Sequence, residues 1–209
     1  MLVPDRCVLS RIGRSKCDIM APKLNIVIGS TRPGRVGPVI GQWVKELAVK
    51  HGKFQVELVD LVDFNLPLLD EAAHPVMQQY EHEHTKRWAA SVAAGDAFIF
   101  LTPEYTSFPP ASLINALQVL SREWAYKPAG IVSYGGISGG LRAAQELRQM
   151  VANLNMHALP QTVPVPQFPQ FINEGVFTPS EPIEQGANGL LNELHKWAVA
   201  LQTVRKDAA

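Results

Sequence analysis

The sequence is poor in cysteine and has neither a long apolar run nor a surplus of charge. Its 2 cysteines, Cys7 and Cys17, both precede Met20, which excludes a disulfide scaffold or a cysteine-based metal site in the rest of the chain. The apolar run at 97–101 has the length of a strand, far below the roughly 18 residues of a membrane-spanning helix. We therefore expect no membrane partner.

Charge is balanced over the chain. Lys and Arg together number 19, Asp and Glu together also number 19, and the formal net charge at pH 7 is +0. A protein that binds nucleic acid regardless of its sequence needs a basic surplus to neutralise phosphates. We therefore expect no nucleic-acid partner. The 209 residues, 46% of them hydrophobic, are typical of a globular domain that buries its own core.

Residues 1–20 differ from the rest, because arginines and scattered apolar residues follow no helical or alternating period. The segment lacks the apolar stretch of a secretory signal. A transit peptide is one interpretation, although Asp5 and Asp18 oppose it. The favoured interpretation is that these residues form a disordered leader, or that the sequence starts upstream of a true first residue at Met20. We predict a leader over 1–20, a single domain over 21–209 and, because the body lacks disulfides, a cytoplasmic location.

Beyond this segment, short apolar runs alternate with stretches of helical period. The runs at 23–28, 54–61, 97–101, 130–133 and 158–165 predict strands. Helices are predicted over 36–52, 80–94, 113–120, 144–154 and 190–201. Strands that alternate with helices predict an α/β fold, a doubly wound parallel sheet with helices on both faces. Ligands of such sheets bind outside the carboxyl ends of the strands, so the loops there are the candidate sites.

The loop after the first strand reads GSTRPGR at 29–35 and opens a helix. Free N–H groups at a helix start favour an anion, and Ser30, Arg32 and Arg35 add donors. The two glycines have the spacing of a Walker A motif, but Arg35 and Val36 stand where that motif needs Lys and Ser or Thr. The loop therefore indicates a phosphate monoester rather than a nucleoside triphosphate. An ordinary turn with solvated arginines is the alternative.

The loop after the third strand reads TPEYTSFPP at 102–110. Its prolines fix the path of the chain, while Tyr105 and exposed amides suit a flat ring with polar edges. A rigid connection with a core tyrosine is the alternative.

The loop after the fourth strand reads SYGGISGG at 133–140. Four glycines allow its backbone to approach a ligand closely, and a helix with Arg142 in its first turn follows. Flexibility without a ligand is the alternative, because glycines often mark simple turns.

Taken together, GSTRPGR, TPEYTSFPPASLINAL and KPAGIVSYGGISGGLRA resemble the NADPH-dependent FMN reductase family, flavodoxin-like enzymes that include quinone, chromate and azo-dye reductases. VELVDLVDFNLPLLDE is similar too, and the resemblance covers about residues 24–159. The PEY and SYGG loops are specific in combination. Thr106 stands where many relatives have Asn, and Ile114 and Gln118 replace a common Lys and Asp. These departures bear on fine contacts and substrate choice rather than on the flavin.

The resemblance implies a flavodoxin-like sheet of five strands in the order 2-1-3-4-5. It implies that the FMN phosphate is held by Ser30, Arg32 and Arg35. It also implies that the isoalloxazine ring is lined, mostly through backbone groups, by Pro103, Glu104, Tyr105 and Thr106, and bordered by Ser133, Tyr134, Gly135 and Gly136. The family is usually dimeric and sometimes tetrameric, so a homodimer or homotetramer is expected.

The implied function is an oxidoreductase. FMN takes a hydride from NADPH or NADH and passes electrons to a quinone, an azo compound, a metal oxyanion or free flavin, while the protein supplies position and electrostatics. We therefore predict no catalytic acid or base. No metal site is predicted either, since the histidines at 74, 82 and 84 match no zinc spacing. A flavodoxin-type electron carrier or redox sensor without NAD(P)H turnover is the alternative, which the neutral charge disfavours.

Four side chains outside the loops carry further expectations. Trp124 follows a helix and is expected beside the flavin or at an interface. Trp197 lies on the apolar face of a predicted helix and is expected in the core. Asp60 and Glu71 flank a loop and are expected to be solvated.

Overall fold

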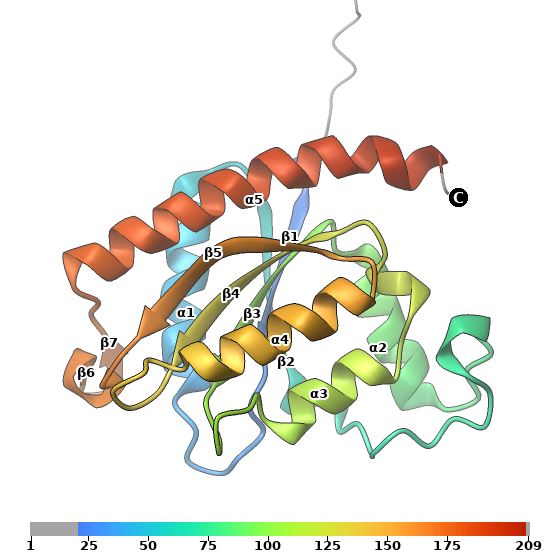
Figure 1. The fold of residues 1–209 in the computed structure, drawn as a ribbon, viewed down its shortest axis with the longest axis horizontal. Helices are drawn as coiled ribbons and strands as arrows, with labels where there is room; N and C mark the ends of the chain where they lie inside the picture. Colours follow the sequence, from blue (N-terminus) through green and yellow to red (C-terminus); the bar gives the residue numbers. More distant parts are fainter. Residues whose placement is uncertain (1–20, 208–209) are drawn as a thin grey trace, which may run out of the picture.

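The computed structural model describes residues 21–207, so the predicted leader lies outside the described residues (Figure 1). Its centre is a five-stranded sheet in the order β2-β1-β3-β4-β5, with every neighbouring pair parallel. The strands are β1 (Lys23–Ile28), β2 (Gln55–Asp60), β3 (Ala97–Pro103), β4 (Pro128–Tyr134) and β5 (His157–Val165). The helices are α1 (Gly37–His51), α2 (Glu83–Ala94), α3 (Ala111–Gln118), α4 (Leu141–Asn153) and α5 (Glu181–Asp207). The predicted fold class and strand order are confirmed.

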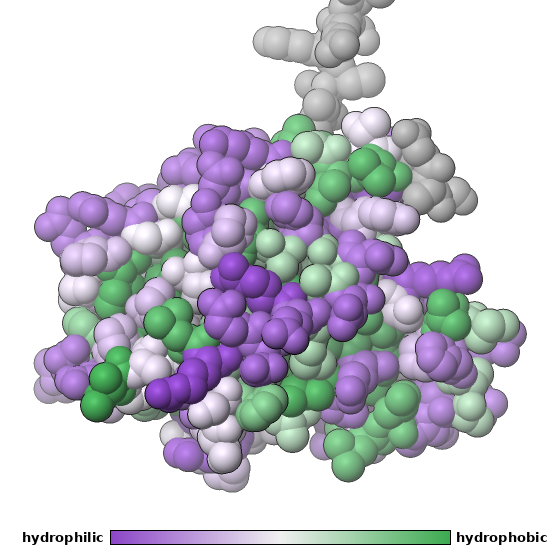
Figure 2. Space-filling view, in the orientation of Figure 1, coloured by the Kyte–Doolittle hydropathy of each residue, from purple (hydrophilic) through white to green (hydrophobic). Residues whose placement is uncertain are grey.

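The core forms two layers, one on each face of the sheet. Apolar side chains of α1 and α5 pack on one face, and those of α2, α3 and α4 pack on the other. Along β1, Leu24, Ile26 and Ile28 face the first layer while Val27 faces the second. Burial on both faces explains why the strand is a continuous apolar run. Hydrophilic residues cover the outer side of α4 (Figure 2).

Helix α1 lies unusually close to β1. A Cβ atom on Gly37 would stand 2.8 Å from Ile28 Cγ2, and one on Gly41 would stand 3.2 Å from Ile28 Cδ1. Both positions therefore use glycine to let the helix backbone meet the isoleucine side chain. This contact fixes the start of α1 directly behind the loop that follows β1.

The chain after β5 differs most from the sequence prediction. Helix α5 begins at Glu181 rather than near residue 190, and a small antiparallel hairpin of β6 (Ile172–Asn173) and β7 (Val176–Phe177) precedes it. Strands this short carry no alternating pattern, so the prediction did not find them. Helix α5 is 27 residues long, yet no helix within residues 21–207 is apolar enough over a sufficient length to cross a bilayer.

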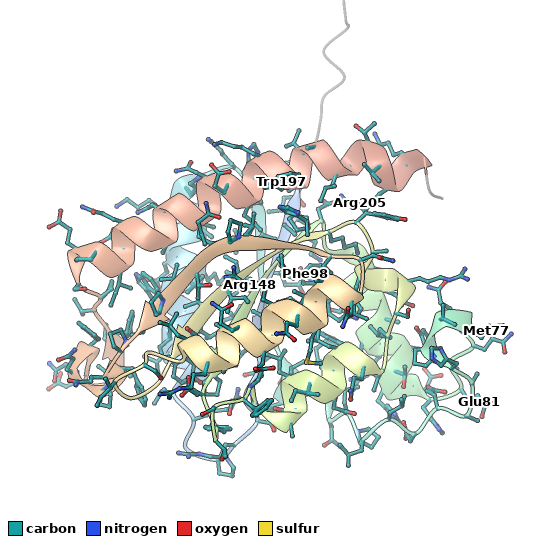
Figure 3. All side chains as sticks on the ribbon, viewed as in Figure 1. Met77, Glu81, Phe98, Arg148, Trp197 and Arg205 are labelled. Atoms are coloured by element: carbon teal, nitrogen blue, oxygen red, sulfur yellow. The ribbon has the colours of Figure 1, made fainter. Side chains whose placement is uncertain are left out.

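Three expectations about single side chains are wrong. Trp124 is fully buried, with its ring centroid 5.2 Å from that of Phe98, so it belongs to the core and not to an interface. Trp197 is 39% exposed, because it lies at the border of the buried face of α5 (Figure 3), and its ring is tilted against that of His157 with centroids 3.8 Å apart. Glu71 is buried, and its carboxylate accepts the backbone N–H groups at 81 and 82.

Candidate functional site

The loops that follow β1, β3, β4 and β5 meet at the carboxyl edge of the sheet, at the lower left of Figure 1, and enclose a cavity of about 280 Å³. Most of the predicted site residues line this cavity: Arg32, Arg35, Pro103, Glu104, Tyr105, Tyr134, Gly135 and Gly136. Gly34, Val36 and Phe168 complete the lining and were not predicted. A doubly wound sheet is expected to bind its ligand at this edge.

Arg35 is committed to an ion pair within the protein. Its guanidinium donates to both oxygens of the Asp60 carboxylate at 2.7 Å, and Nη1 also donates to the Ser30 carbonyl at 3.0 Å. The expectation that Asp60 is solvated is therefore wrong. Asp60 ends β2 beside the last residue of β1, Ile28, which brings it within reach of the loop. The pair neutralises much of the charge of Arg35 and anchors the loop to the sheet.

Arg32 is the exposed cation of the same loop. Its guanidinium carbon lies 5.7 Å from the centre of the Tyr105 ring, and the ion pairs of residues 21–207 give it no carboxylate. The Tyr105 hydroxyl shares a hydrogen bond of 2.9 Å with Ser30 Oγ. Ser30 itself is buried and joins the first loop to the second rather than lining the cavity. Arg32 can therefore receive an anion, and the positive end of α1 lies behind it, although Pro38 has no N–H and the Val39 N–H already donates to the Val36 carbonyl.

The second loop is a tight hairpin. Tyr105 and Phe108 exchange two backbone hydrogen bonds of 2.9 Å, and the residues between them have positive φ, 50° at Thr106 and 68° at Ser107. Such turns favour Asn-Gly, and a β-branched residue in the left-handed region is strained. Thr106 stands exposed at the tip and does not line the cavity.

The glycines of the third loop divide into two kinds. Gly140 has φ 82°, and a Cβ there would stand 2.8 Å from the Tyr134 nitrogen, so the fold itself requires glycine. Gly136 has no positive φ, and a Cβ there would meet nothing within 4 Å. Because Gly136 lines the cavity, the space above it suits a ligand that approaches the backbone closely. Ser133 is buried, and its hydroxyl donates to the Gly139 carbonyl, which holds the loop from behind.

Tyr134 and Phe168 form the apolar end of the cavity. Their rings lie edge to face at 5.4 Å, and burial raises the pKa of the Tyr134 hydroxyl. The Gln167 N–H donates to the Gly136 carbonyl at 2.8 Å, which ties the Phe168 segment to the glycine loop. Three loops were predicted from the sequence to bind the ligand, and the Pro-rich segment after the fifth strand was not among them. That segment also follows the carboxyl end of a strand, and this position alone could have indicated from the sequence that Phe168 lies at the site.

Glu104 turns its carboxylate toward the glycine loop and α4. It accepts hydrogen bonds from Ser138 Oγ and from the backbone N–H and Nη1 of Arg142. Burial raises the pKa of the Glu104 carboxyl, but the hydrogen bonds from Arg142 and Ser138 outweigh burial and hold the pKa below its usual range. Glu104 is therefore ionised at neutral pH and unsuited to proton transfer.

Several known proteins similar to this chain are named as FMN reductases or quinone reductases. The sequence profile of the family described as NADPH-dependent FMN reductase matches residues 22–170. An NAD(P)H-dependent FMN reductase of Schizosaccharomyces pombe is 40% identical over 164 residues, which cover 77% of this chain and 81% of the relative. A quinone reductase of Pseudomonas putida is 31% identical over 137 residues, 63% of this chain and 70% of the relative.

The fold has solved counterparts. The flavoenzyme NAD(P)H:(acceptor) oxidoreductase FerB of Paracoccus denitrificans superposes with a TM-score of 0.67 at 18% identity, over 86% of this chain and 98% of that one. This likeness supports the flavodoxin-like architecture. The profile match and the 40% identical relative place the chain in the NADPH-dependent FMN reductase family, whose members use FMN with NAD(P)H as co-substrate.

Proposed function

We propose that this enzyme passes electrons from NADPH or NADH through bound FMN to a quinone. The observation that carries the proposal is that one cavity joins Arg32, a cation without an ion-pair partner among residues 21–207, to a bare backbone wall at Gly136. These two features suit the phosphate and the flat ring of one FMN molecule. FMN, when bound, accepts a hydride from the pyridine nucleotide and passes electrons onward.

The phosphate end is assigned to the loop between β1 and α1. Arg32 supplies the charge, and the N-terminus of α1 adds its partial positive charge. Arg35 is paired with Asp60 and shapes this loop. The guanidinium N–H groups that do not donate to Asp60 are assigned to the phosphate. Ser30 holds the loop against Tyr105.

The ring end is assigned to two backbone walls. Residues 103–105 form one wall, and residues 134–136 form the other, with Phe168 beside Tyr134. The ionised Glu104 is held by Ser138 and Arg142, and the cavity presents no other carboxylate or histidine among its lining residues. The role assigned to the chain is therefore to bind and orient, with no acid or base of its own.

Exposed apolar side chains beside the cavity suit an apolar acceptor. Ile137, next to Gly136, is 89% exposed, and Phe108, paired with Tyr105, is 53% exposed. Exposed apolar side chains directly adjacent to cavity-lining residues favour a quinone over a metal oxyanion. Proteins named as quinone reductases from Pseudomonas putida and as quinone oxidoreductases from rice and Arabidopsis are among the relatives, which supports the same choice.

A homodimer or homotetramer in the cytoplasm is part of the proposal. Leu68 is 77% exposed beside the half-exposed Leu69, and both lie in the loop that follows β2. These two adjacent leucines offer an apolar contact to a second subunit. Sedimentation of the purified chain measures the oligomer directly.

Stopped-flow mixing with NADPH tests whether the protein is a reductase. We expect NADPH or NADH alone to bleach the bound flavin, and a quinone to restore its colour. Initial-rate plots at several quinone concentrations should be parallel, because both substrates must use the same open face. A flavin that stays oxidised for minutes under excess NADPH and NADH would refute the proposal and favour an electron carrier. Azo dye, chromate and free FMN, assayed alongside, rank the acceptors.

A further inference from the structure

The Glu104 carboxylate joins the two walls of the cavity. Glu104 belongs to the loop after β3, and all its side-chain partners lie after β4. Ser138 Oγ lies 3.1 Å from each carboxylate oxygen, the Arg142 N–H donates over 3.1 Å, and Arg142 Nη1 donates over 2.9 Å. The Glu104 N–H also donates to the Tyr134 carbonyl at 3.2 Å, so backbone and side chain both cross between the walls.

The start of α4 depends on this carboxylate. The first N–H groups of a helix have no partner within the helix, and residue 140, which precedes α4, is glycine and has no side chain to cap them. Glu104 supplies the cap from another loop, and its negative charge also suits the helix N-terminus. Hydrogen bonds to an ionised acceptor are about twice as strong as neutral ones.

The other restraints on the glycine loop come from its own side of the cavity: Ser133 Oγ donates to the Gly139 carbonyl, and the Gly135 N–H donates to the Val165 carbonyl. Gly135 and Gly136 follow β4, and the Gly136 carbonyl accepts the N–H groups of Gly139 and Gln167. Without the carboxylate, the stretch from Gly136 to the start of α4 would be connected to the loop after β3 only through the pairing of β4 with β3. Because glycine allows many backbone conformations, the spacing of the walls would then vary.

We propose that Glu104 is a positioning residue, whose carboxylate holds the glycine loop and α4 at the spacing that the flavin ring needs. This inference rests on the proposed function, since it assumes that the ring lies between these walls. It assigns the Glu104 side chain to the shape of the ring site rather than to the phosphate end. The exposed Arg142 side chain contributes little, because it is 66% exposed, whereas Ser138 Oγ and the helix N–H carry the effect.

Asp96 offers a matched control at the other edge of the sheet. Its carboxylate accepts the Lys23 N–H at 2.9 Å and Arg205 Nη2 at 2.6 Å, so it also joins separate segments through one backbone N–H and one arginine (Figure 3 labels Arg205). Asp96 directly precedes β3 and therefore lies at the amino ends of the strands, away from the cavity. Asp96→Asn should lower the melting temperature and leave flavin binding unchanged.

The test compares FMN with riboflavin, which lacks the phosphate. Both flavins are titrated into the apo-forms of wild type, Glu104→Ala, Glu104→Gln, Ser138→Ala, Arg142→Gln and Asp96→Asn, and each melting temperature is measured. Glu104→Ala should weaken both flavins by the same factor, about ten- to a hundredfold, which is the range for hydrogen bonds to a charged group. Ser138→Ala should weaken both to a smaller degree, and Arg142→Gln by less than about threefold.

Two results would overturn the inference alone. Glu104 variants that melt like Asp96→Asn but bind both flavins as wild type would show that the carboxylate serves stability only. A loss confined to FMN would place Glu104 at the phosphate end. If Glu104→Ala does not fold, Glu104→Gln and Ser138→Ala keep the test decisive, because each removes part of the contact at nearly constant size. A wild type that binds neither flavin refutes the proposed function together with this inference.

Discussion

Arg32 and Arg35 should respond differently to the same substitution, although they lie three positions apart in one loop. Arg32→Gln removes an exposed cation that has no carboxylate partner among the described ion pairs. We expect it to weaken FMN and to leave riboflavin binding unchanged, because only FMN carries a phosphate. Arg35→Gln removes the partner of Asp60 and the bond to the Ser30 carbonyl, so it should disturb the loop itself and weaken both flavins.

The size of each effect follows from exposure. A hydrogen bond to a charged group contributes about 1.5–3 kcal/mol, and solvent at an exposed arginine favours the lower end, which is about tenfold in affinity. The Arg32 effect should shrink with added salt, since the Debye length falls from about 10 Å at 0.1 M to about 3 Å at 1 M. Arg35→Gln leaves the partly buried Asp60 unpaired, so its melting temperature should fall while that of Arg32→Gln stays near wild type.

Titration of FMN and riboflavin into each apo-variant, at low and high salt, measures all of these differences. Equal losses of the two flavins in Arg32→Gln would refute the assignment of the phosphate to Arg32. A loss confined to FMN in Arg35→Gln, with an unchanged melting temperature, would show that the pair with Asp60 opens to receive the phosphate.

Three further predictions concern strain, space and pH. Thr106→Asn should raise the melting temperature of the apo-protein by roughly 2–4 °C, because relief of a left-handed β-branched residue is worth about 1 kcal/mol, and no rise would contradict the strain argument. Gly136→Val should melt like wild type yet bind neither flavin, and flavin binding by this variant would place the ring elsewhere. Gly140→Ala should lower the melting temperature, because only the side chain added at position 140 meets backbone atoms. Burial lowers the pKa of His157 below 6.5, so the unfolded chain takes up this proton first as the pH falls. The free energy of unfolding should therefore be greatest above pH 6.5 and decline below it. Urea titrations should show a smaller decline in His157→Gln, and an equal decline would exclude His157 as a source of the pH dependence.

Much of the fold could be predicted because its strands are buried on both faces. A strand such as β1 must then be apolar at every position, which makes it a visible run with sharp limits. The order of the strands came from resemblance, since apolar runs carry no information about which strands are neighbours. The two-residue strands of the β6–β7 hairpin are too short to show a period. The start of α5 was missed because its first turns are rich in glycine, glutamate and glutamine and therefore show no apolar period.

The site could be predicted only as far as loops reveal it. Glycines, prolines and arginines after a strand mark a ligand loop, but the partner of each side chain depends on contacts across strands. The pairing of Arg35 with Asp60 follows from the register in which Ile28 faces Asp60, and no local pattern contains that register. Phe168 lies in a Pro-rich segment without periodicity, so only the general rule about strand ends pointed to it. Trp124 stands among polar neighbours in the sequence, which concealed its place in the core.

The close contact of α1 with β1 limits how this enzyme can be redesigned. Any side chain at position 37 would meet Ile28 and push the helix away from the sheet, and the anion-binding end of the cavity would move with it. A library that seeks a new flavin preference should therefore keep position 37 as glycine or vary it together with position 28. Ile28→Val would not relieve this contact, because valine keeps the Cγ2 atom that the new Cβ would meet; Gly37→Ala would need Ile28→Ala, which removes that atom. Cofactor choice in this scaffold is thus coupled to a packing contact that lies beneath the binding surface.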